Sequence, residues 1–369
     1  MIDPDELGAW LRLLETPGVG RESARKLLAA FGSPHAVIAA STAARRDLVG
    51  SIQAGALASE PEPLGALVAM TLAWLRADAV EPRAVITLGD PRYPRALLEA
   101  ADPPLLLYAQ GRFELLQIDA IAVVGSRNPT PQGADNARAF SSHLSDAGLT
   151  VVSGLALGID AAAHTGGLEG TASSVAVVGT GLDRVYPRRN LRLAHRLAER
   201  GLIISEYAPG TPALPPNFPM RNRIIAGLAR GTLVVEAALK SGSLITARLA
   251  NEAGREVFAI PGSIHSPQSR GCHALIKQGA KLVETARDIL EELHLPSTAA
   301  ARGRPADTTA TSADDPLLTA LGFDPVTLDA LAARTGWSAA ELNSRLLGLE
   351  LDGHVARLPG QLFQRVARR

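Results

Sequence analysis

Six short apolar runs, rich in β-branched residues and separated by stretches with helical spacing, constrain the fold more than any other feature of this sequence. Short strands that alternate with helices are typical of parallel sheets whose two faces are both covered. The sequence therefore predicts an α/β domain built on a doubly wound, mostly parallel sheet. The expected strands are 121–124, 149–152, 174–178, 202–205, 231–235 and 256–260.

The length and composition place this sheet within a larger chain. At 369 residues, two or three domains are expected. We predict a helical domain over 1–80, the α/β domain over 81–295, a flexible linker over 296–315 and a winged-helix-like domain over 316–369. The last is expected to hold helices over 327–335 and 338–351 and a hairpin turned by Asp352-Gly353.

The composition disfavours a disulfide-bonded, secreted or membrane-spanning protein. A single cysteine excludes an intramolecular disulfide and fits a reducing cytosol. The acidic N-terminus does not look like a signal peptide, and no long apolar run predicts a membrane span, so we expect a cytoplasmic protein. Aromatic residues make up only 4% of the chain, which leaves few rings to stack on bases.

The charge is zero overall but uneven along the chain. Residues 121–290 hold 18 Lys and Arg against 12 Asp and Glu, an excess of six positive charges. A polyanion would dock on this middle segment, although an excess of this size also arises by ordinary variation.

The segment 218–227, FPMRNRIIAG, combines an aromatic ring, an asparagine and two arginines before an apolar run. If Arg221 and Arg223 precede the first turn of a helix, both guanidinium groups can lie beside exposed backbone N–H groups. Such an arrangement binds phosphate, whereas the alternative is a solvated, basic helix start.

The loops after the expected strands carry more anion donors. The β-branched run 121–124 is followed by a glycine, a serine and an arginine, and the run 231–235 by a lysine against Ser-Gly-Ser. These loops, with 218–223 and the turn near 270, supply the candidate residues for binding an anion such as a nucleic-acid phosphate. They are Gly125, Ser126, Arg127, Gly154, Phe218, Arg221, Asn222, Arg223, Lys240, Ser241, Gly242, Ser243 and Arg270.

Catalytic and metal signatures are not found. Asp160 and His164 are four residues apart, a spacing that allows an acid/base pair but more often gives a structural hydrogen bond. Cys272-His273 is too close together to chelate a metal, and neither a Walker A sequence nor a nucleophile elbow occurs. The pattern predicts binding without turnover and no cofactor.

Two further features keep an alternative open. Arg188, Arg192 and Arg196 share one face of an expected helix, which could follow a nucleic-acid backbone or be a solvated surface. The Pro17-Gly18-Val19-Gly20 turn fits a DNA-binding helix-hairpin-helix or a plain helix connector.

Taken together, the motifs resemble those of the DNA-processing protein family DprA, also called Smf. The matching pieces are GSR at 125–127, SGLALGID at 153–160, FPMRNRIIAGL at 218–228, SGSLITA at 241–247 and PG at 261–262. One departure is His273, which stands where the family usually has asparagine.

The resemblance implies an extended Rossmann-like domain that binds single-stranded DNA. It also implies a homodimer that protects incoming DNA and loads the RecA recombinase during natural transformation. By matching position, Arg127, the 218–223 segment and Lys240 would line the DNA groove, while Gly125 and Ser126 would shape the phosphate pocket.

The main alternative is a nucleoside-monophosphate phosphoribohydrolase of the lysine-decarboxylase-like type. Gly231-Thr232 and Glu236 match part of that enzyme motif, with Glu236 as a base, but the preceding Pro-Gly-Gly is missing. A buried or helix-capping carboxylate is the other interpretation of Glu236.

Overall fold

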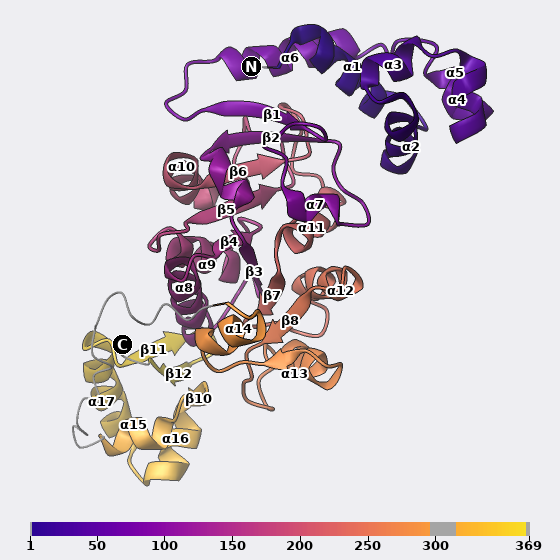
Figure 1. The fold of residues 1–369 in the computed structure, drawn as a ribbon. Coiled ribbons are helices and arrows are strands. Elements are labelled where there is room, and N and C mark those ends of the chain that lie inside the picture. The colour runs from indigo at the N-terminus through magenta and orange to yellow at the C-terminus, as the bar shows by residue number, and fades with distance from the viewer. Residues whose placement is uncertain (1, 296–314, 367–369) are drawn as a thin grey trace.

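The computed structural model describes residues 2–295 and 315–366 as three parts of an elongated molecule (Figure 1). Helices fill the N-terminal part, a nine-stranded sheet forms the middle, and a small helical and β unit lies at the other end. The predicted linker lies outside the described residues apart from Asp315. The predicted boundaries between the domains remain predictions.

The N-terminal part consists of short helices, as the sequence predicted. They are α1 (Pro4–Glu15), α2 (Arg21–Phe31), α3 (Pro34–Ala39), α4 (Thr42–Val49), α5 (Ser51–Ala56) and α6 (Leu64–Arg76). Their apolar faces pack together and against the first two strands of the sheet, where Trp74 meets Tyr108 edge to face at 5.9 Å between ring centroids. The N-terminal part is therefore packed against the sheet through a shared apolar core.

The sheet has the order β1-β2-β6-β5-β4-β3-β7-β8-β9. Six of its strands confirm the six predicted ones to within a residue or so at each end. The strands are β1 (Arg83–Thr87), β2 (Leu106–Gly111), β3 (Ala120–Val124), β4 (Thr150–Ser153), β5 (Ser174–Val178), β6 (Leu202–Ser205), β7 (Gly231–Val234), β8 (Glu256–Ala259) and β9 (Lys281–Leu282).

The seven strands β6, β5, β4, β3, β7, β8 and β9 each run parallel to the next strand in the sheet. In contrast, β1 and β2 form an antiparallel edge that the sequence did not reveal. Every residue of β3 is buried, and its side chains alternate between two cores on opposite faces of the sheet. This double burial is why the strand reads as a continuous apolar run.

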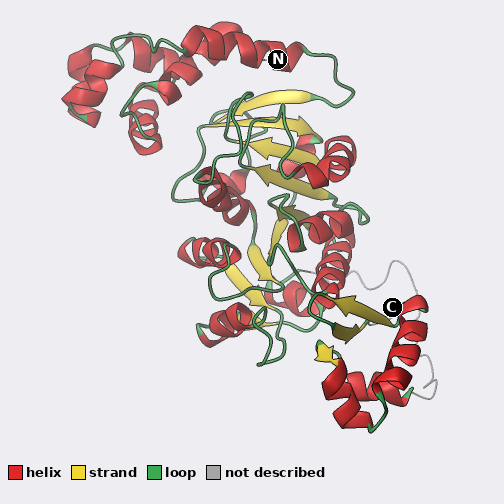
Figure 2. Ribbon diagram, turned by 180° about the vertical axis from the view of Figure 1, so that it is seen from behind, coloured by secondary structure: helices red, strands yellow, loops and turns green. Residues whose placement is uncertain are grey.

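Helices cover both faces of the sheet, as Figure 2 shows from behind. One face carries α8 (Pro131–Asp146), α9 (Ile159–Gly167), α10 (Leu191–Arg200) and α14 (Ala286–Glu292). The other carries α7 (Arg95–Leu98), α11 (Asn217–Leu228), α12 (Ser243–Glu252) and α13 (Arg270–Lys277). Short 3-10 turns, η1 (Phe113–Gln117) and η2 (Arg188–Asn190), complete the connections.

The strand order reverses direction between β3 and β7. Strands β3 to β6 follow one another toward one edge, and β7 to β9 follow toward the other. At such a switch point the loops after the two central strands diverge and leave a crevice beyond their carboxyl ends. The fold thus places a binding site after β3 and β7.

The C-terminal part is a winged helix, as predicted. Its elements are α15 (Pro316–Leu321), β10 (Val326–Thr327), α16 (Leu328–Thr335), α17 (Ala339–Leu351), β11 (Val355–Leu358) and β12 (Leu362–Arg365), around a leucine-rich core. The predicted hairpin turn at Asp352-Gly353 is wrong. These residues end α17, with Gly353 at φ 72°, and the hairpin turns at Pro359-Gly360-Gln361 instead.

Candidate nucleic-acid interface

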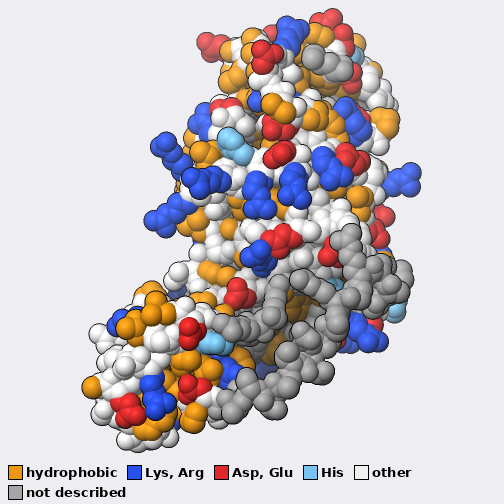
Figure 3. Space-filling view, turned by 90° about the vertical axis from the view of Figure 1, so that its left-hand side faces the viewer, with side chains coloured by type: hydrophobic (Ala, Val, Ile, Leu, Met, Phe, Trp, Pro, Cys, Tyr) orange, Lys and Arg blue, Asp and Glu red, His pale blue; other side chains and the backbone are white. Residues whose placement is uncertain are grey.

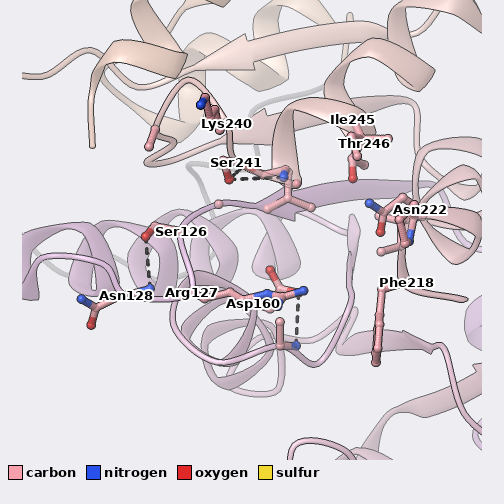
Figure 4. A pocket seen from close by; sticks show the side chains of 18 of the residues that line it. Ser126, Arg127, Asn128, Asp160, Phe218, Asn222, Lys240, Ser241, Ile245 and Thr246 are labelled. Carbon is pink, nitrogen blue, oxygen red and sulfur yellow. Dashed lines mark hydrogen bonds between the residues drawn. The ribbon is translucent and has the colours of Figure 1, made fainter. Parts of the chain in front are cut away.

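A pocket of about 550 Å³ lies at the switch point between β3 and β7. We call it the strand-end pocket. Its walls are the loop after β3, the loop after β7 with the start of α12, and the first turns of α11 (Figure 4). Ten of the thirteen residues predicted to bind DNA line it, namely Gly125, Ser126, Arg127, Phe218, Arg221, Asn222, Lys240, Ser241, Gly242 and Ser243.

The wall after β3 is a tight turn. A Cβ on Gly125 would come within 2.7 Å of the Ile159 side chain and 2.9 Å of the Glu236 carbonyl oxygen, so only glycine fits there. The hydroxyl of Ser126 accepts a hydrogen bond from the Asn128 N–H at 3.1 Å and shapes the turn. The turn leaves Arg127 exposed at the pocket mouth, with no hydrogen bond or ion pair to any described residue.

The opposite wall follows β7. Lys240 is exposed there and likewise has no partner within the described parts of the chain. The Ser241 and Ser243 hydroxyls are hydrogen-bonded at 2.7 Å just where α12 begins, and no side chain caps that helix. Figure 4 shows Lys240 and Arg127 on opposite sides of the pocket. Two free cations and an uncapped helix start favour an anion in between.

The third wall is the start of α11. Phe218 contacts Tyr186, with 5.5 Å between ring centroids, and a Cβ on Gly179 would meet the Phe218 ring. The Asn222 amide lines the pocket and has no hydrogen-bond partner among the described residues. This wall offers a ring for stacking and an amide for polar contacts, which are the groups that recognise an unpaired base.

Comparisons with known proteins agree with this geometry. A sequence model described as DNA recombination-mediator protein A matches residues 84–294. The chain belongs to the DprA/Smf family of DNA-processing proteins. A second model, described as the DprA winged helix domain, matches residues 299–361.

Relatives in this family are similar over most of their length. The chain is 46% identical to Protein Smf of Escherichia coli over 275 residues, which covers 73% of this chain and 74% of the relative. It is 50% identical to the DNA processing protein DprA of Streptococcus pneumoniae over 203 residues, covering 55% of this chain and 72% of that protein.

Solved DprA structures share the fold. The X-ray structure of Streptococcus pneumoniae DprA aligns with a TM-score of 0.68 at 37% identity, covering 79% of this chain and 98% of that one. A Helicobacter pylori DprA structure, described for its single-stranded DNA binding mode, aligns with a TM-score of 0.52 at 29% identity, covering 57% and 95%.

In this DprA/Smf chain the two arginines of the 218–228 motif do not precede a helix. The helix α11 begins at Asn217, so the condition for a pair of phosphate ligands at its start is not met. Arg221 is 5% exposed and Arg223 is held in ion pairs away from the pocket. The two arginines therefore have different roles.

Arg221 lies beneath the strand-end pocket. Its Nη1 donates to the Val177 carbonyl oxygen at 2.5 Å, and the buried carboxylate of Asp160 attracts it. Burial is the main cause that lowers the pKa of the Arg221 guanidinium and raises the pKa of Asp160. Gly154 does not line the pocket, and its lack of a side chain makes room for this guanidinium.

Arg223 does not line the pocket. Its guanidinium donates to the Glu206 carboxylate and to the Asp102 carbonyl oxygen, the latter at 2.7 Å. Arg270 also lies outside, exposed at the start of α13. The pocket is therefore lined by fewer of the candidate residues than the sequence motifs predicted.

The Asp160–His164 pair is structural rather than catalytic. Asp160 accepts hydrogen bonds from the N–H groups of Gly154 and Ala156 at 3.1 and 3.2 Å. His164 accepts from the Leu155 N–H through Nε2 and donates through Nδ1 to Ser174. Burial lowers the pKa of His164 to about 3, so this imidazole is neutral at physiological pH.

Glu236 is also committed to structure. Its carboxylate accepts from the Thr130 N–H at 3.0 Å and the Thr130 hydroxyl at 2.6 Å, and Thr130 in turn caps α8. It does not line the strand-end pocket. The phosphoribohydrolase hypothesis needs this carboxylate as a free base, so the geometry disfavours that hypothesis.

Ten other residues line the pocket without having been among the thirteen candidates, and two of them are polar residues in contact with each other. Asn128 and Gln268 line the strand-end pocket, and the Gln268 amide donates to the Asn128 carbonyl oxygen at 3.2 Å. Both follow predicted strands, so their position in strand-end loops was the available signal. His273, which departs from the family pattern, places Nε2 3.0 Å from the Gly262 carbonyl oxygen.

A basic surface extends beside the pocket. Arg188, Arg189, Arg192 and Arg196 lie along η2 and α10, and none of them pairs with another described residue. Figure 3, which views the side that carries α10, shows Lys and Arg side chains gathered across the middle of the molecule. This surface begins two residues after Tyr186, the partner ring of Phe218.

Residues 2–295 and 315–366 contain no group of three or more His, Cys, Asp or Glu side chains placed to hold a metal ion. Among the same residues, no helix combines the length and apolar character needed to cross a bilayer.

Proposed function

We propose that this protein binds single-stranded DNA at the strand-end pocket and acts, without catalytic turnover, as a recombination mediator. In this role it protects incoming DNA and loads RecA onto it during natural transformation. The observation that carries the proposal is the pair of free cations, Arg127 and Lys240, on opposite walls of a pocket at the sheet's switch point. Their charges suit the phosphates of a nucleic-acid strand.

The third wall supports a single strand over a duplex. The ring of Phe218 and the amide of Asn222 can reach a base only where it is unpaired and turned out of a helix. The Helicobacter pylori relative is described as a single-stranded DNA binder, and it supports the same activity here.

The arginines of η2 and α10 extend the proposed path. From Phe218 the strand would pass Tyr186 and then follow Arg188, Arg189 and Arg192, whose charges have no protein partner among the described residues. This geometry favours contact with the DNA backbone and little sequence preference.

Dimerisation and RecA loading are part of the proposal. The dimer is checked by the mass of the protein in solution over a range of concentrations. RecA loading is checked by RecA filament growth on a single strand already covered by a single-stranded DNA-binding protein. Growth that does not respond to this protein would remove the mediator role and leave DNA binding.

The central experiment measures the anisotropy of a labelled single-stranded oligonucleotide in a salt series, with a duplex of the same sequence beside it. We expect log Kd to rise with log salt. Arg127→Ala should raise Kd roughly 10- to 150-fold, because a charged hydrogen bond contributes about 1.5–3 kcal/mol. It should also reduce the salt slope by about 0.7, the value for one phosphate contact on a single strand.

Arg46→Ala is the matched control, because Arg46 is exposed and unpaired on the N-terminal helix α4. Its Kd should stay close to wild type. A salt-independent Kd, or equal effects of the two variants, would contradict binding at the strand-end pocket. Ribose release from adenosine monophosphate would instead support the phosphoribohydrolase.

A further inference from the structure

Five charged side chains from four segments meet on the side of α11 that faces away from the strand-end pocket. We call them the domain clamp: Arg21 and Arg25 of α2, Asp102 before β2, Glu206 after β6, and Arg223 of α11. In Figure 1, α2 is the N-terminal helix that reaches toward α7 and α11. The clamp thus joins the N-terminal part to the helix that forms one wall of the pocket.

Asp102 is the centre of the clamp. Its carboxylate lies 2.7 Å from Arg21 Nη2, 2.6 Å from Arg25 Nη1 and 3.3 Å from Arg223 Nε. These arginines lower the pKa of Asp102, against the opposing effect of its burial. One carboxylate therefore binds both sides of the junction.

Arg223 makes the contacts on the pocket side. Its side chain is 12% exposed, it donates to Glu206 and to the Asp102 carbonyl oxygen, and Glu206 is itself 3.8 Å from Arg21. Its Nε has no hydrogen-bond partner among the described residues, but this nitrogen is buried 3.3 Å from the Asp102 carboxylate and is not exposed to a phosphate. Its neighbour Asn222 lines the pocket, because successive side chains on a helix point about 100° apart.

We propose that Arg223 is a positioning residue, which couples the docking of α2 to the strand-end pocket instead of binding DNA. The proposal rests on the proposed binding of single-stranded DNA. When the clamp is formed, its contacts hold α11 on the side that faces away from the pocket. The helix then keeps Phe218 and Asn222 directed toward the pocket. Opening the clamp from either side then weakens binding, although Arg21 and Arg25 do not line the pocket.

The test opens the clamp from each side separately. Arg21→Gln/Arg25→Gln removes its α2 side, Arg223→Gln removes its α11 side, and a third variant combines all three changes. Arg46→Gln/Arg76→Gln is the control for the loss of two charges, because both arginines are exposed in the N-terminal part and unpaired among the described residues. Arg223→Lys keeps the charge but loses the forked geometry.

The readouts are the Kd for a labelled oligodeoxythymidylate in a salt series and hydrogen exchange of the α2 amides in the free protein. We expect both single-side variants to raise exchange in α2 and to raise Kd on the order of 5- to 150-fold, the usual range of coupling between two sites. The combined variant should bind no more weakly than the weaker of the two, and the salt slope should stay at its wild-type value.

Other outcomes overturn the proposal. If Arg223→Gln reduces the salt slope by about 0.7 while Arg21→Gln/Arg25→Gln binds like the control, Arg223 is a phosphate ligand. If the α2-side variant raises exchange but leaves Kd unchanged, the clamp holds α2 without reaching the pocket. Should Arg223→Gln fail to fold, Arg223→Lys and the α2-side variant decide between these cases.

Failure of the proposed function looks different. If the wild-type protein does not bind single-stranded DNA, no variant changes Kd, and the proposed function fails. Exchange in α2 then tests the clamp alone: higher exchange in Arg223→Gln supports the connection, and unchanged exchange overturns it.

Discussion

The guanidinium of Arg221 lies directly against the backbone of Gly154. A Cβ built on this glycine would be 1.8 Å from Arg221 Nη1, far inside van der Waals contact. The absence of a side chain at Gly154 lets a buried positive charge lie beside Asp160 and reach the Val177 carbonyl oxygen at 2.5 Å. The loop after β4 and the helix α11 therefore pack closely against each other at this contact.

Gly154→Ala should strongly destabilise the protein. The new methyl group must displace the Arg221 guanidinium and leave a buried charge without its partners, which costs roughly 3–5 kcal/mol. The free energy of unfolding from urea titrations measures this loss.

Gly242→Ala is the matched control for that change. Gly242 has helical backbone angles, with φ −63°, and open space where a Cβ would lie. Its unfolding free energy should stay within about 0.5 kcal/mol of wild type. Similar losses in both variants would show that the Gly154–Arg221 contact has no special cost.

Phe218→Ala should weaken binding of single-stranded DNA while the fold persists, because Phe218 is only partly buried. Loss of one base stack costs about 1–3 kcal/mol, or roughly 5- to 150-fold in Kd. Phe218→Tyr keeps the ring and should bind nearly as well, which anisotropy titrations would check. A folded Phe218→Ala variant with wild-type Kd would mean that the ring only packs against Tyr186.

His164 should make stability depend on acidity. Its pKa is about 3 in the folded protein and about 6.5 when unfolded, so the unfolded chain binds the proton first. The stabilisation from neutral His164 is fully present above pH 6.5 and is lost as the pH falls from 6.5 toward 3. Over this range the free energy of unfolding falls by up to about 1.4 kcal/mol per pH unit.

His164→Gln isolates this effect, because every other titrating group is shared with wild type. Between pH 6 and pH 4, the unfolding free energy of the variant should fall less steeply than that of wild type. The difference in slope should be up to about 1.4 kcal/mol per pH unit, the value for one proton. Parallel curves would contradict a buried, neutral His164.

Much of the fold could be predicted from the sequence. The six parallel strands were found because burial on both faces leaves continuous apolar runs such as Ala120–Val124. The antiparallel strand Arg83–Thr87 was not predicted, although its buried run over 84–87 resembles the runs of the predicted strands. The hairpin turn was misplaced because Asp-Gly ends a helix as readily as it turns two strands.

The candidate site could be predicted only in part. Arg127 and Lys240 were identified because they follow strands, and the loops after parallel strands meet at one edge of a sheet. The different roles of Arg221 and Arg223 could not be predicted. In the sequence they are equivalent basic residues, and their partners Asp160, Asp102 and Glu206 lie far away in the chain.

The sequence by itself determined the six parallel strands from β3 to β8, the loops that follow them, and the family motifs those loops carry. Local spacing and side-chain chemistry are sufficient for these features. Only the tertiary structure decided that β3 lies beside β7, and therefore which loops enclose a pocket. It also decided which arginines remain free for an anion, because an arginine is available only where folding brings no carboxylate or carbonyl to it.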